Sequence, residues 1–170
     1  MANSYFILGG ARSGKSRRAL ELAEGLAKRR AFIATAEAWD DEMAERIARH
    51  KTERGAGWST IEAPLDLLKA LEMAEQHGQV CLVDCLTLWL SNLMHHDRDV
   101  ERESARLCEV VIAMPIPIIL VSNEVGLGLV PETPLGRAFR DAQGRLNQAV
   151  ANVCDRVEFV AAGLPIVLKG

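Results

Sequence analysis

The 170-residue sequence lacks several features that mark other classes of protein. No apolar stretch approaches the roughly 20 residues of a membrane-spanning helix, so we expect no transmembrane segment. No run of basic residues occurs and the formal net charge is −3, which gives no electrostatic reason to expect a nucleic acid as partner. The N-terminus has neither a charged leader nor a signal-length apolar core. This predicts a cytoplasmic protein, with a membrane-peripheral location left open.

Cysteine is scarce and widely spaced. The four cysteines are Cys81, Cys85, Cys108 and Cys154, and no two of them form a C-x-x-C pair. Such close spacing is typical of zinc sites and redox motifs. Cys81 and Cys85 flank the end of a predicted buried strand, so we interpret these residues as core thiols rather than as a disulfide or a zinc site.

No internal boundary is visible in the sequence. It contains no repeat, no low-complexity tract and no shift in composition, and 49% of its residues are hydrophobic against 25% charged. This balance is ordinary for a globular protein, and the length suffices for one full core. We therefore expect residues 1–170 to form a single domain.

The most informative segment is rich in glycine and lies near the start. The apolar run 4–8 leads into Gly9-Gly10-Ala11-Arg12-Ser13-Gly14-Lys15-Ser16, which has the spacing G-x-x-x-x-G-K-S and is followed by a helical pattern. In a strand, glycine-rich loop and helix that follow one another in this way, the backbone N–H groups of the loop surround a phosphate, and the helix dipole favours the negative charge of that phosphate. Lys15 would reach the β- and γ-phosphates, and the Ser16 hydroxyl would bind Mg²⁺. A chance glycine-rich turn is the alternative, but the flanking strand and helix favour a nucleoside triphosphate site.

Strand and helix patterns alternate along the rest of the chain. We predict strands over 31–35, 59–63, 79–84, 117–122, 157–162 and 166–169, and helices over 17–30, 40–52, 64–76, 86–94, 100–113 and 135–153. Alternation at this spacing indicates βαβ units and a mostly parallel sheet flanked by helices. With the phosphate loop, it predicts an α/β fold of the P-loop NTPase type.

Polar residues follow three of the predicted buried strands. Asp84 ends the strand 79–84, which is the usual place for a carboxylate that binds Mg²⁺ directly or through water. The alternative is a carboxylate that caps the next turn. Glu124 takes the same place after the strand 117–122, and both a catalytic and a structural role stay open for it. The segment 35–37 would open at the same sheet edge, where α/β sheets bind ligands.

His50 falls in the last turn of the predicted helix 40–52. A histidine there is commonly a favourable charge at the negative end of the helix dipole. A neutral imidazole can instead attack phosphorus and form a phosphoramidate, which splits one transfer into two steps. Basic residues lie close by in the sequence: Arg46, Arg49, Lys51 and Arg54. They would neutralise a triphosphate or simply face solvent, so the residues alone leave the role of His50 open.

A second histidine cluster is less informative. His95 and His96 precede Asp97, but adjacent histidines point in different directions and no third ligand is suitably spaced. We interpret this segment as a loop rather than as a metal site.

Several segments together resemble one enzyme family. They are GGARSGKS, IATAEAWDDEMAERIARHK, WSTIEAP, DCLTLWLSN, VSNEVGLGLVP, FRDAQGRLNQAVA and VAAGLPIVLKG, and they span essentially the whole chain. In this order they are similar to the bifunctional adenosylcobinamide kinase/adenosylcobinamide-phosphate guanylyltransferases of cobalamin biosynthesis. The combination of DDEM-x-x-RI-x-x-H with NEVG-x-G-x-VP is the most specific part of the resemblance.

The resemblance implies two successive reactions. Enzymes of this family phosphorylate the aminopropanol hydroxyl of adenosylcobinamide with ATP or GTP. They then transfer GMP from GTP to that phosphate, giving adenosylcobinamide-GDP and pyrophosphate. The guanylyl group passes through a covalent histidine intermediate, and the histidine of the motif falls on His50. The resemblance therefore favours the nucleophile over the helix-end charge.

The resemblance also implies a set of site residues. His50 and Lys15 would be catalytic, and Ser16 and Asp84 would bind Mg²⁺. The nucleotide contacts carry over onto Gly9, Gly10, Ala11, Arg12, Ser13, Gly14, Lys15, Ser16, Ala34, Thr35, Ala36, Lys51, Thr52, Glu53, Arg54, Glu62 and Asp84. The family is similar to RecA-type P-loop folds and includes trimers, so a homo-oligomer is expected. The region 95–100 is shorter than in some relatives, which leaves its role open.

Two rival functions remain at this point, and a third is disfavoured. A plain small-molecule kinase, with His50 only a helix-end charge, would never carry a covalent nucleotide. A regulatory module would bind GTP without turnover, and a nucleic-acid motor is disfavoured by the acidic balance and small size.

Overall fold

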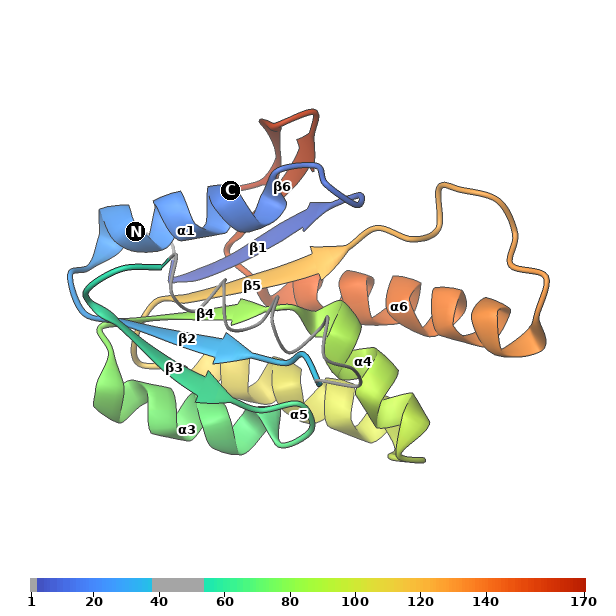
Figure 1. Ribbon diagram of the computed structural model, residues 1–170, viewed down its shortest axis with the longest axis horizontal. Helices are drawn as coiled ribbons and strands as arrows, with labels where there is room; N and C mark the ends of the chain where they lie inside the picture. Colours follow the sequence, from blue (N-terminus) through green and yellow to red (C-terminus); the bar gives the residue numbers. More distant parts are fainter. Residues whose placement is uncertain (1–2, 38–53) are drawn as a thin grey trace.

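The computed structural model describes residues 3–37 and 54–170 (Figure 1). Its seven strands form one sheet in the order β3-β2-β4-β5-β1-β6-β7. The strands are β1 (Ser4–Gly9), β2 (Arg30–Ala34), β3 (Trp58–Glu62), β4 (Val80–Asp84), β5 (Ile118–Asn123), β6 (Arg156–Ala161) and β7 (Leu164–Lys169). All neighbours pair in parallel except β6 and β7, which are antiparallel. The predicted mostly parallel sheet is therefore confirmed.

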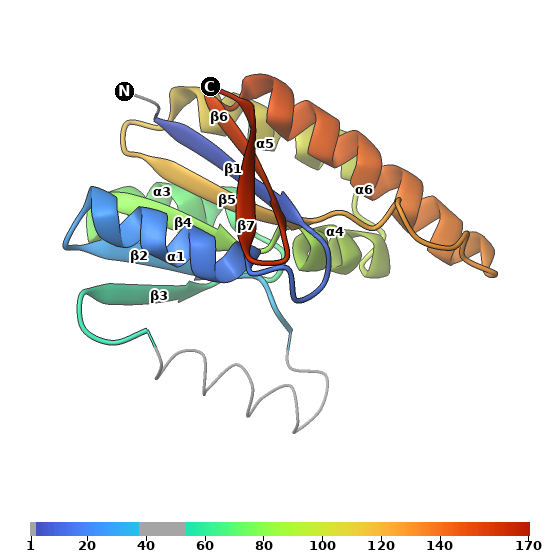
Figure 2. The ribbon, with the colours of Figure 1, turned by 90° about the horizontal axis from the view of Figure 1, so that it is seen from above.

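Helices cover both faces of this sheet. They are α1 (Lys15–Leu26), α3 (Leu67–His77), α4 (Leu86–His95), α5 (Val100–Ala113) and α6 (Pro134–Val153). Figures 1 and 2 show α1 on one face and the other four helices on the opposite face. Each buried strand alternates between two cores: Tyr5 and Ile7 pack under α1, whereas Phe6 and Leu8 pack toward α3–α6. The same alternation determines which side chains at the strand ends face the phosphate loop.

Most predicted elements occur, and the differences lie at their ends. The first helix begins at Lys15 and ends at Leu26 instead of spanning 17–30, because Ala27 takes an extended conformation that stops the helix. The helix predicted from 64 begins at Leu67 instead. His95, predicted in a loop, is the last residue of α4, since the N–H of His96 still donates to the carbonyl of Asn92. The predicted helix 40–52 lies outside the described residues.

Two helices begin at residues that suit a helix start. The Asp99 side chain accepts from the backbone N–H of Arg102 (3.0 Å) at the start of α5. Thr133 accepts from the N–H of Gly136 (3.1 Å) at the start of α6, where Pro134 takes the first helical position. Both side chains satisfy a donor that has no partner inside the helix.

The cysteines are free thiols, as predicted. Cys81, Cys85 and Cys154 are buried in the cores and Cys108 is half-buried. Burial raises the pKa of Cys85 to about 11 and that of Cys154 to about 12, so both stay protonated at neutral pH. Residues 3–37 and 54–170 hold no group of three or more His, Cys, Asp or Glu side chains that could bind a metal ion together. None of their helices is long and apolar enough to cross a membrane.

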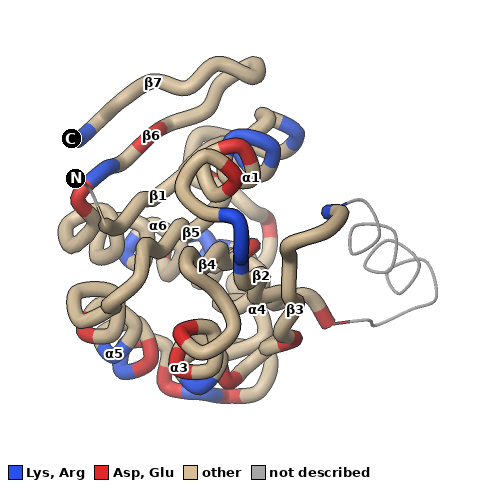
Figure 3. The backbone as a smooth tube through the Cα atoms, turned by 90° about the vertical axis from the view of Figure 1, so that its left-hand side faces the viewer, with Lys and Arg blue, Asp and Glu red and all other residues tan. Residues whose placement is uncertain are grey.

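The two edges of the sheet differ in exposure. Figure 3 shows β7 and β3 at opposite ends of the sheet. Every residue of β7 is exposed, and its large apolar side chains are Leu164, Ile166, Val167 and Leu168. Exposed apolar edge strands are templates for pairing with another chain.

Candidate nucleotide site

The phosphate loop joins the end of β1 to the start of α1. Gly14 precedes the helix with φ 96°, a conformation that favours glycine. The Lys15 side chain is buried, and its ammonium group donates to the carbonyl of Gly10 (3.1 Å). A helix N-terminus and a buried ammonium group therefore converge on one loop, which is the arrangement that binds polyphosphate.

Close packing explains the first glycine of the loop. A Cβ on Gly9 would lie 2.4 Å from the hydroxyl oxygen of Ser13 and 2.6 Å from the carbonyl oxygen of Val160. No side chain fits at those distances. The Ser13 hydroxyl is itself buried and has no hydrogen-bond partner among the described residues.

The strand ends place several predicted site residues on the face that α1 covers. Phe32 and Leu82 belong to the core under α1, whereas Ile33 and Val83 belong to the opposite core. By alternation Ala34 and Asp84 face α1. Helix α1 packs against β1, β4 and β5. Since these strands are parallel, the N-terminus of α1, which follows β1, and Asp84, which ends β4, lie at the same end of the sheet.

Arg54 adds a positive charge to this face. Its guanidinium carbon lies 3.7 Å from the centre of the Phe32 ring, and its Nη2 donates to the Thr60 hydroxyl (3.2 Å). Burial lowers the pKa of Arg54, and attraction to Asp84 opposes that effect. The Asp84 carboxylate therefore acts on the Arg54 guanidinium through its charge.

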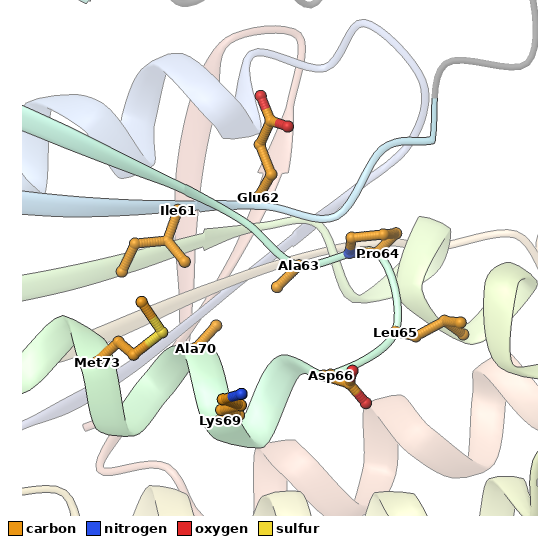
Figure 4. Close-up of a pocket in the computed structure, with 9 residues that line it drawn as sticks. All are labelled: Ile61, Glu62, Ala63, Pro64, Leu65, Asp66, Lys69, Ala70 and Met73. Carbon is orange, nitrogen blue, oxygen red and sulfur yellow. The ribbon is translucent and has the colours of Figure 1, made fainter.

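The Glu62 side chain points away from α3, toward the face of the sheet that α1 covers. Figure 4 shows its carboxylate pointing away from Ile61, Ala70 and Met73. Those apolar residues line a cavity of about 330 Å³ between the end of β3 and α3. The carboxylate thus lies at the rim of this cavity, on the side of the sheet that bears α1.

Thr35 has a different environment from its neighbours in the predicted set. Its buried hydroxyl donates to the carbonyl of Cys85 (2.7 Å) and accepts from the Cys85 N–H (2.9 Å). The side chain of Asn92 donates to the Thr35 carbonyl (2.8 Å). These bonds hold the ends of β2 and β4 together, so a nucleotide contact by Thr35 stays a prediction.

Four predicted site residues, His50, Lys51, Thr52 and Glu53, lie outside the described residues, and their roles stay predictions. Arg54 is the first described residue after this gap, and the structure tests nothing about His50.

Sequence reasoning missed a buried polar network at the end of β5. The Ser122 hydroxyl donates to Asn147 (2.8 Å) and accepts from Gln143 (3.0 Å), while Thr87 lies 3.4 Å from the same hydroxyl. All four side chains are buried. The available signal was the spacing of Gln143 and Asn147, four residues apart on the apolar face of α6.

The comparisons with known proteins identify the family. The family model for cobinamide kinase / cobinamide phosphate guanyltransferase matches residues 5–168. The chain belongs to this family. Bifunctional adenosylcobalamin biosynthesis protein CobP of Pseudomonas aeruginosa is 51% identical over 168 residues, covering 96% of both chains. Protein CobU of Salmonella typhimurium is 38% identical over 180 residues, covering 96% of this chain and 98% of that one.

Solved structures that resemble this cobinamide kinase / guanyltransferase family member show its fold class. An ATPase of a bacterial type III secretion system matches with a TM-score of 0.58 at 13% identity, over 97% of this chain and 56% of that one. The secretion ATPase EscN of enteropathogenic E. coli matches with a TM-score of 0.53 at 12% identity, over 95% and 43%. The chain spans about half the length of these ATPases. The predicted P-loop NTPase fold is confirmed.

Proposed function

We propose that this chain phosphorylates the hydroxyl of adenosylcobinamide with ATP or GTP and then transfers GMP from GTP to the new phosphate. The proposal rests on the family match over residues 5–168, joined to a phosphate loop whose lysine is buried at a helix N-terminus. The products are adenosylcobinamide-GDP and pyrophosphate. Residues 1–170 act as one domain in this proposal, and the reactions take place in the cytoplasm.

In the kinase step the substrate hydroxyl oxygen attacks the γ-phosphorus, and the bond to the β,γ-bridging oxygen breaks. Backbone N–H groups of Gly9 to Ser16 hold the phosphates, and the ammonium group of Lys15 offsets their charge. Lys15 leaves the Gly10 carbonyl to do so. The unpartnered hydroxyl of Ser13 supports this role, because a bound phosphate supplies the acceptor that it lacks among the described residues.

Mg²⁺ fits the oxygen ligands that this face offers. Ser16 lies in the first turn of α1, and α1 packs on the strand that ends in Asp84. A hydroxyl and a carboxylate are hard oxygen donors, which Mg²⁺ prefers alongside phosphate oxygens. We propose Ser16 and Asp84 as the protein groups that hold the ion. A bound Mg²⁺ would neutralise part of the phosphate charge.

We propose the remaining nucleotide contacts as follows. Ala34 and Ala36 flank Thr35 at the end of β2, Arg54 brings a cation, and Glu62 brings a carboxylate suited to the donors of a guanine ring. Lys51, Thr52 and Glu53 complete the proposed set from the segment outside the described residues.

In the guanylyl step neutral His50 attacks the α-phosphorus of GTP and pyrophosphate leaves. The phosphate of adenosylcobinamide phosphate then attacks the same phosphorus, and His50 is released. This division of labour predicts that the kinase step continues without His50.

Label transfer tests the guanylyl step directly. Protein is incubated with α-³²P-GTP and Mg²⁺ and compared with His50→Ala. We expect acid-labile, alkali-stable label on wild type and none on the variant. His77→Ala is the matched control, since His77 is an exposed histidine in the last turn of another helix and should leave labelling unchanged.

Two results would contradict the proposal. Wild type that binds GTP without taking label would leave only a kinase. Equal loss of kinase and guanylyltransferase activity in a folded His50→Ala protein would refute the separate role of His50.

We also propose that the chain forms a homo-oligomer, with a trimer as the first candidate. The exposed apolar residues of the edge strand β7 support this, because association would remove them from water. Light scattering on wild type and on Val167→Lys checks it, and a wild-type mass equal to one chain would refute it.

A further inference from the structure

Asn123, the last residue of β5, lies between the phosphate loop and Asp84. In the sheet, β5 separates β1 from β4, and Asn123 is the direct partner of Gly9. The same strand pairs Val121 with Asp84 on its other side. The N–H of Glu124 then donates to the Gly9 carbonyl (3.1 Å), so the contact between the strands continues past Asn123.

Asn123 faces the phosphate loop by strand alternation. Ile119 and Val121 pack in the core under α1, whereas Ile118 and Leu120 pack toward α3–α6. Ser122 follows the second group and bonds to α6. Asn123 therefore takes the same face as Asp84 and the N-terminus of α1.

The backbone of Asn123 is fixed from the opposite face. Its N–H donates to the hydroxyl of Thr87 (2.8 Å), and its carbonyl accepts from the side chain of Asn147 (3.1 Å). Thr87 and Asn147 are both buried. Buried polar side chains are costly unless they are bonded, so a network of this kind holds one backbone position firmly.

The side chain of Asn123, unlike its backbone, is not held by this network. Within residues 3–37 and 54–170 its carboxamide makes no hydrogen bond, and the residue is only partly buried. A held backbone that presents an unpaired amide donor is suited to bind an anion. The groups around it, the phosphate loop with Lys15 and the carboxylate of Asp84, identify that anion as the terminal phosphate of the nucleotide.

We propose that the carboxamide N–H₂ of Asn123 donates to the γ-phosphate of the bound nucleoside triphosphate, with Thr87 and Asn147 as positioning residues. The inference rests on the proposed function only for the presence of a nucleotide at this loop. It assigns to the strand end 122–124 a role separate from that of Glu124, whose side chain accepts from the N–H of Gly126.

The test compares affinities for α,β-methylene-GTP and α,β-methylene-GDP in the presence of Mg²⁺. Neither analogue can transfer its α-phosphate, and only the first has a γ-phosphate. We expect Asn123→Ala to reduce the triphosphate-to-diphosphate affinity ratio about tenfold, the effect of losing one hydrogen bond to a charged group. Asn123→Asp should reduce it further, because a carboxylate repels the γ-phosphate.

Asn152→Ala is the matched control. Asn152 is an exposed asparagine in α6, and its replacement should leave the ratio unchanged. With adenosylcobinamide added, Asn123→Ala should lower kcat of the kinase step about 100-fold. Thermal unfolding separates a site effect from a folding defect, since Asn123→Asp keeps the shape of the side chain.

The outcomes are distinct. A ratio within twofold of wild type in both Asn123 variants would overturn the inference. So would equal weakening of both analogues with loss of stability, which marks a structural role. A ratio that depends on Asn123 in a protein that phosphorylates no corrinoid would support the inference and overturn the proposed kinase function. Wild type that binds neither analogue would overturn both.

Discussion

The backbone N–H of Gly163 donates to the carbonyl of Ser13 at 2.7 Å, so the tip of the β6–β7 hairpin is bonded to the phosphate loop. The two residues are far apart in the sequence, and Gly14, next to Ser13, also packs closely against the hairpin. A Cβ on Gly14 would lie 3.1 Å from the Gly163 Cα. The hairpin therefore supports the loop from outside, which restricts the conformations that the loop can adopt.

Gly14→Ala should destabilise the protein and weaken nucleotide binding. Gly14 has φ 96°, which strains any side chain, and the new methyl group would press on Gly163. We expect a loss of about 1–3 kcal/mol in the free energy of unfolding, measured by urea denaturation. Gly144→Ala is the control: it lies inside α6 with open space around it, and should stabilise by about 0.5–1 kcal/mol. Equal stability of the two variants would contradict the interpretation.

Lys15→Met should remove catalysis with little effect on folding. The side chain is buried, and methionine fills similar space without the charge that binds phosphate. We expect kcat/KM of the kinase step to fall at least about 100-fold, measured in a steady-state assay with labelled ATP. Lys28→Met replaces an exposed lysine beyond the far end of α1 and should leave the rate unchanged. A Lys15→Met protein with near-wild-type activity would refute a role of this loop in phosphoryl transfer.

Asp84→Asn should raise the Mg²⁺ concentration needed for half-maximal activity about tenfold or more, because a neutral amide binds the ion more weakly. Titration of Mg²⁺ against nucleotide affinity and against kinase rate measures the shift. Asp66→Asn, at an exposed carboxylate before α3, serves as the control. Identical Mg²⁺ dependence in wild type and Asp84→Asn would exclude Asp84 as a ligand.

Glu158→Gln should destabilise the protein in a pH-dependent way. The Glu158 carboxylate is 1% exposed, and Arg18 binds it through two nitrogens, at 2.8 and 3.0 Å. The hydrogen bond from Arg18 lowers the pKa of Glu158 from its usual value of 4.5. The ionised form thus stabilises the folded state fully at pH values well above 4.5, and this contribution is lost as the pH falls through the lowered pKa.

We expect Glu158→Gln to lose roughly 1.5–3 kcal/mol at pH 7, because the neutral amide offers one acceptor oxygen and no charge to Arg18 and Arg156. The difference from wild type should shrink as the pH falls below about 4 in urea denaturation, by about the free energy that the pKa shift represents. Glu75→Gln, at an exposed glutamate, should show no such trend. A difference that grows with acidity would have the wrong sign for a lowered pKa.

The local sequence was sufficient for the elements and for the phosphate loop. Hydrophobic runs that end in glycine or acid identified β1 and β4, and the spacing from Gly9 to Ser16 identified a phosphate site. These signals are short-range: backbone geometry near glycine and the periodicity of buried residues act within a few positions. Helix ends were less predictable: α1 stops where Ala27 turns extended, which no residue type there signals, and α3 starts only at the buried Leu67.

Only the tertiary structure decided which strand ends became neighbours. The sequence places Asp84, Asn123 and Gly9 at the ends of three strands, yet it contains no record of the order β4-β5-β1 that brings them together. It equally could not show that Thr35 turns toward Cys85, or that Gly163 reaches the phosphate loop. Strand order and facing are set by long-range packing of two cores on one sheet. The chemistry of each residue was therefore readable in the sequence, whereas its partners were determined by the fold.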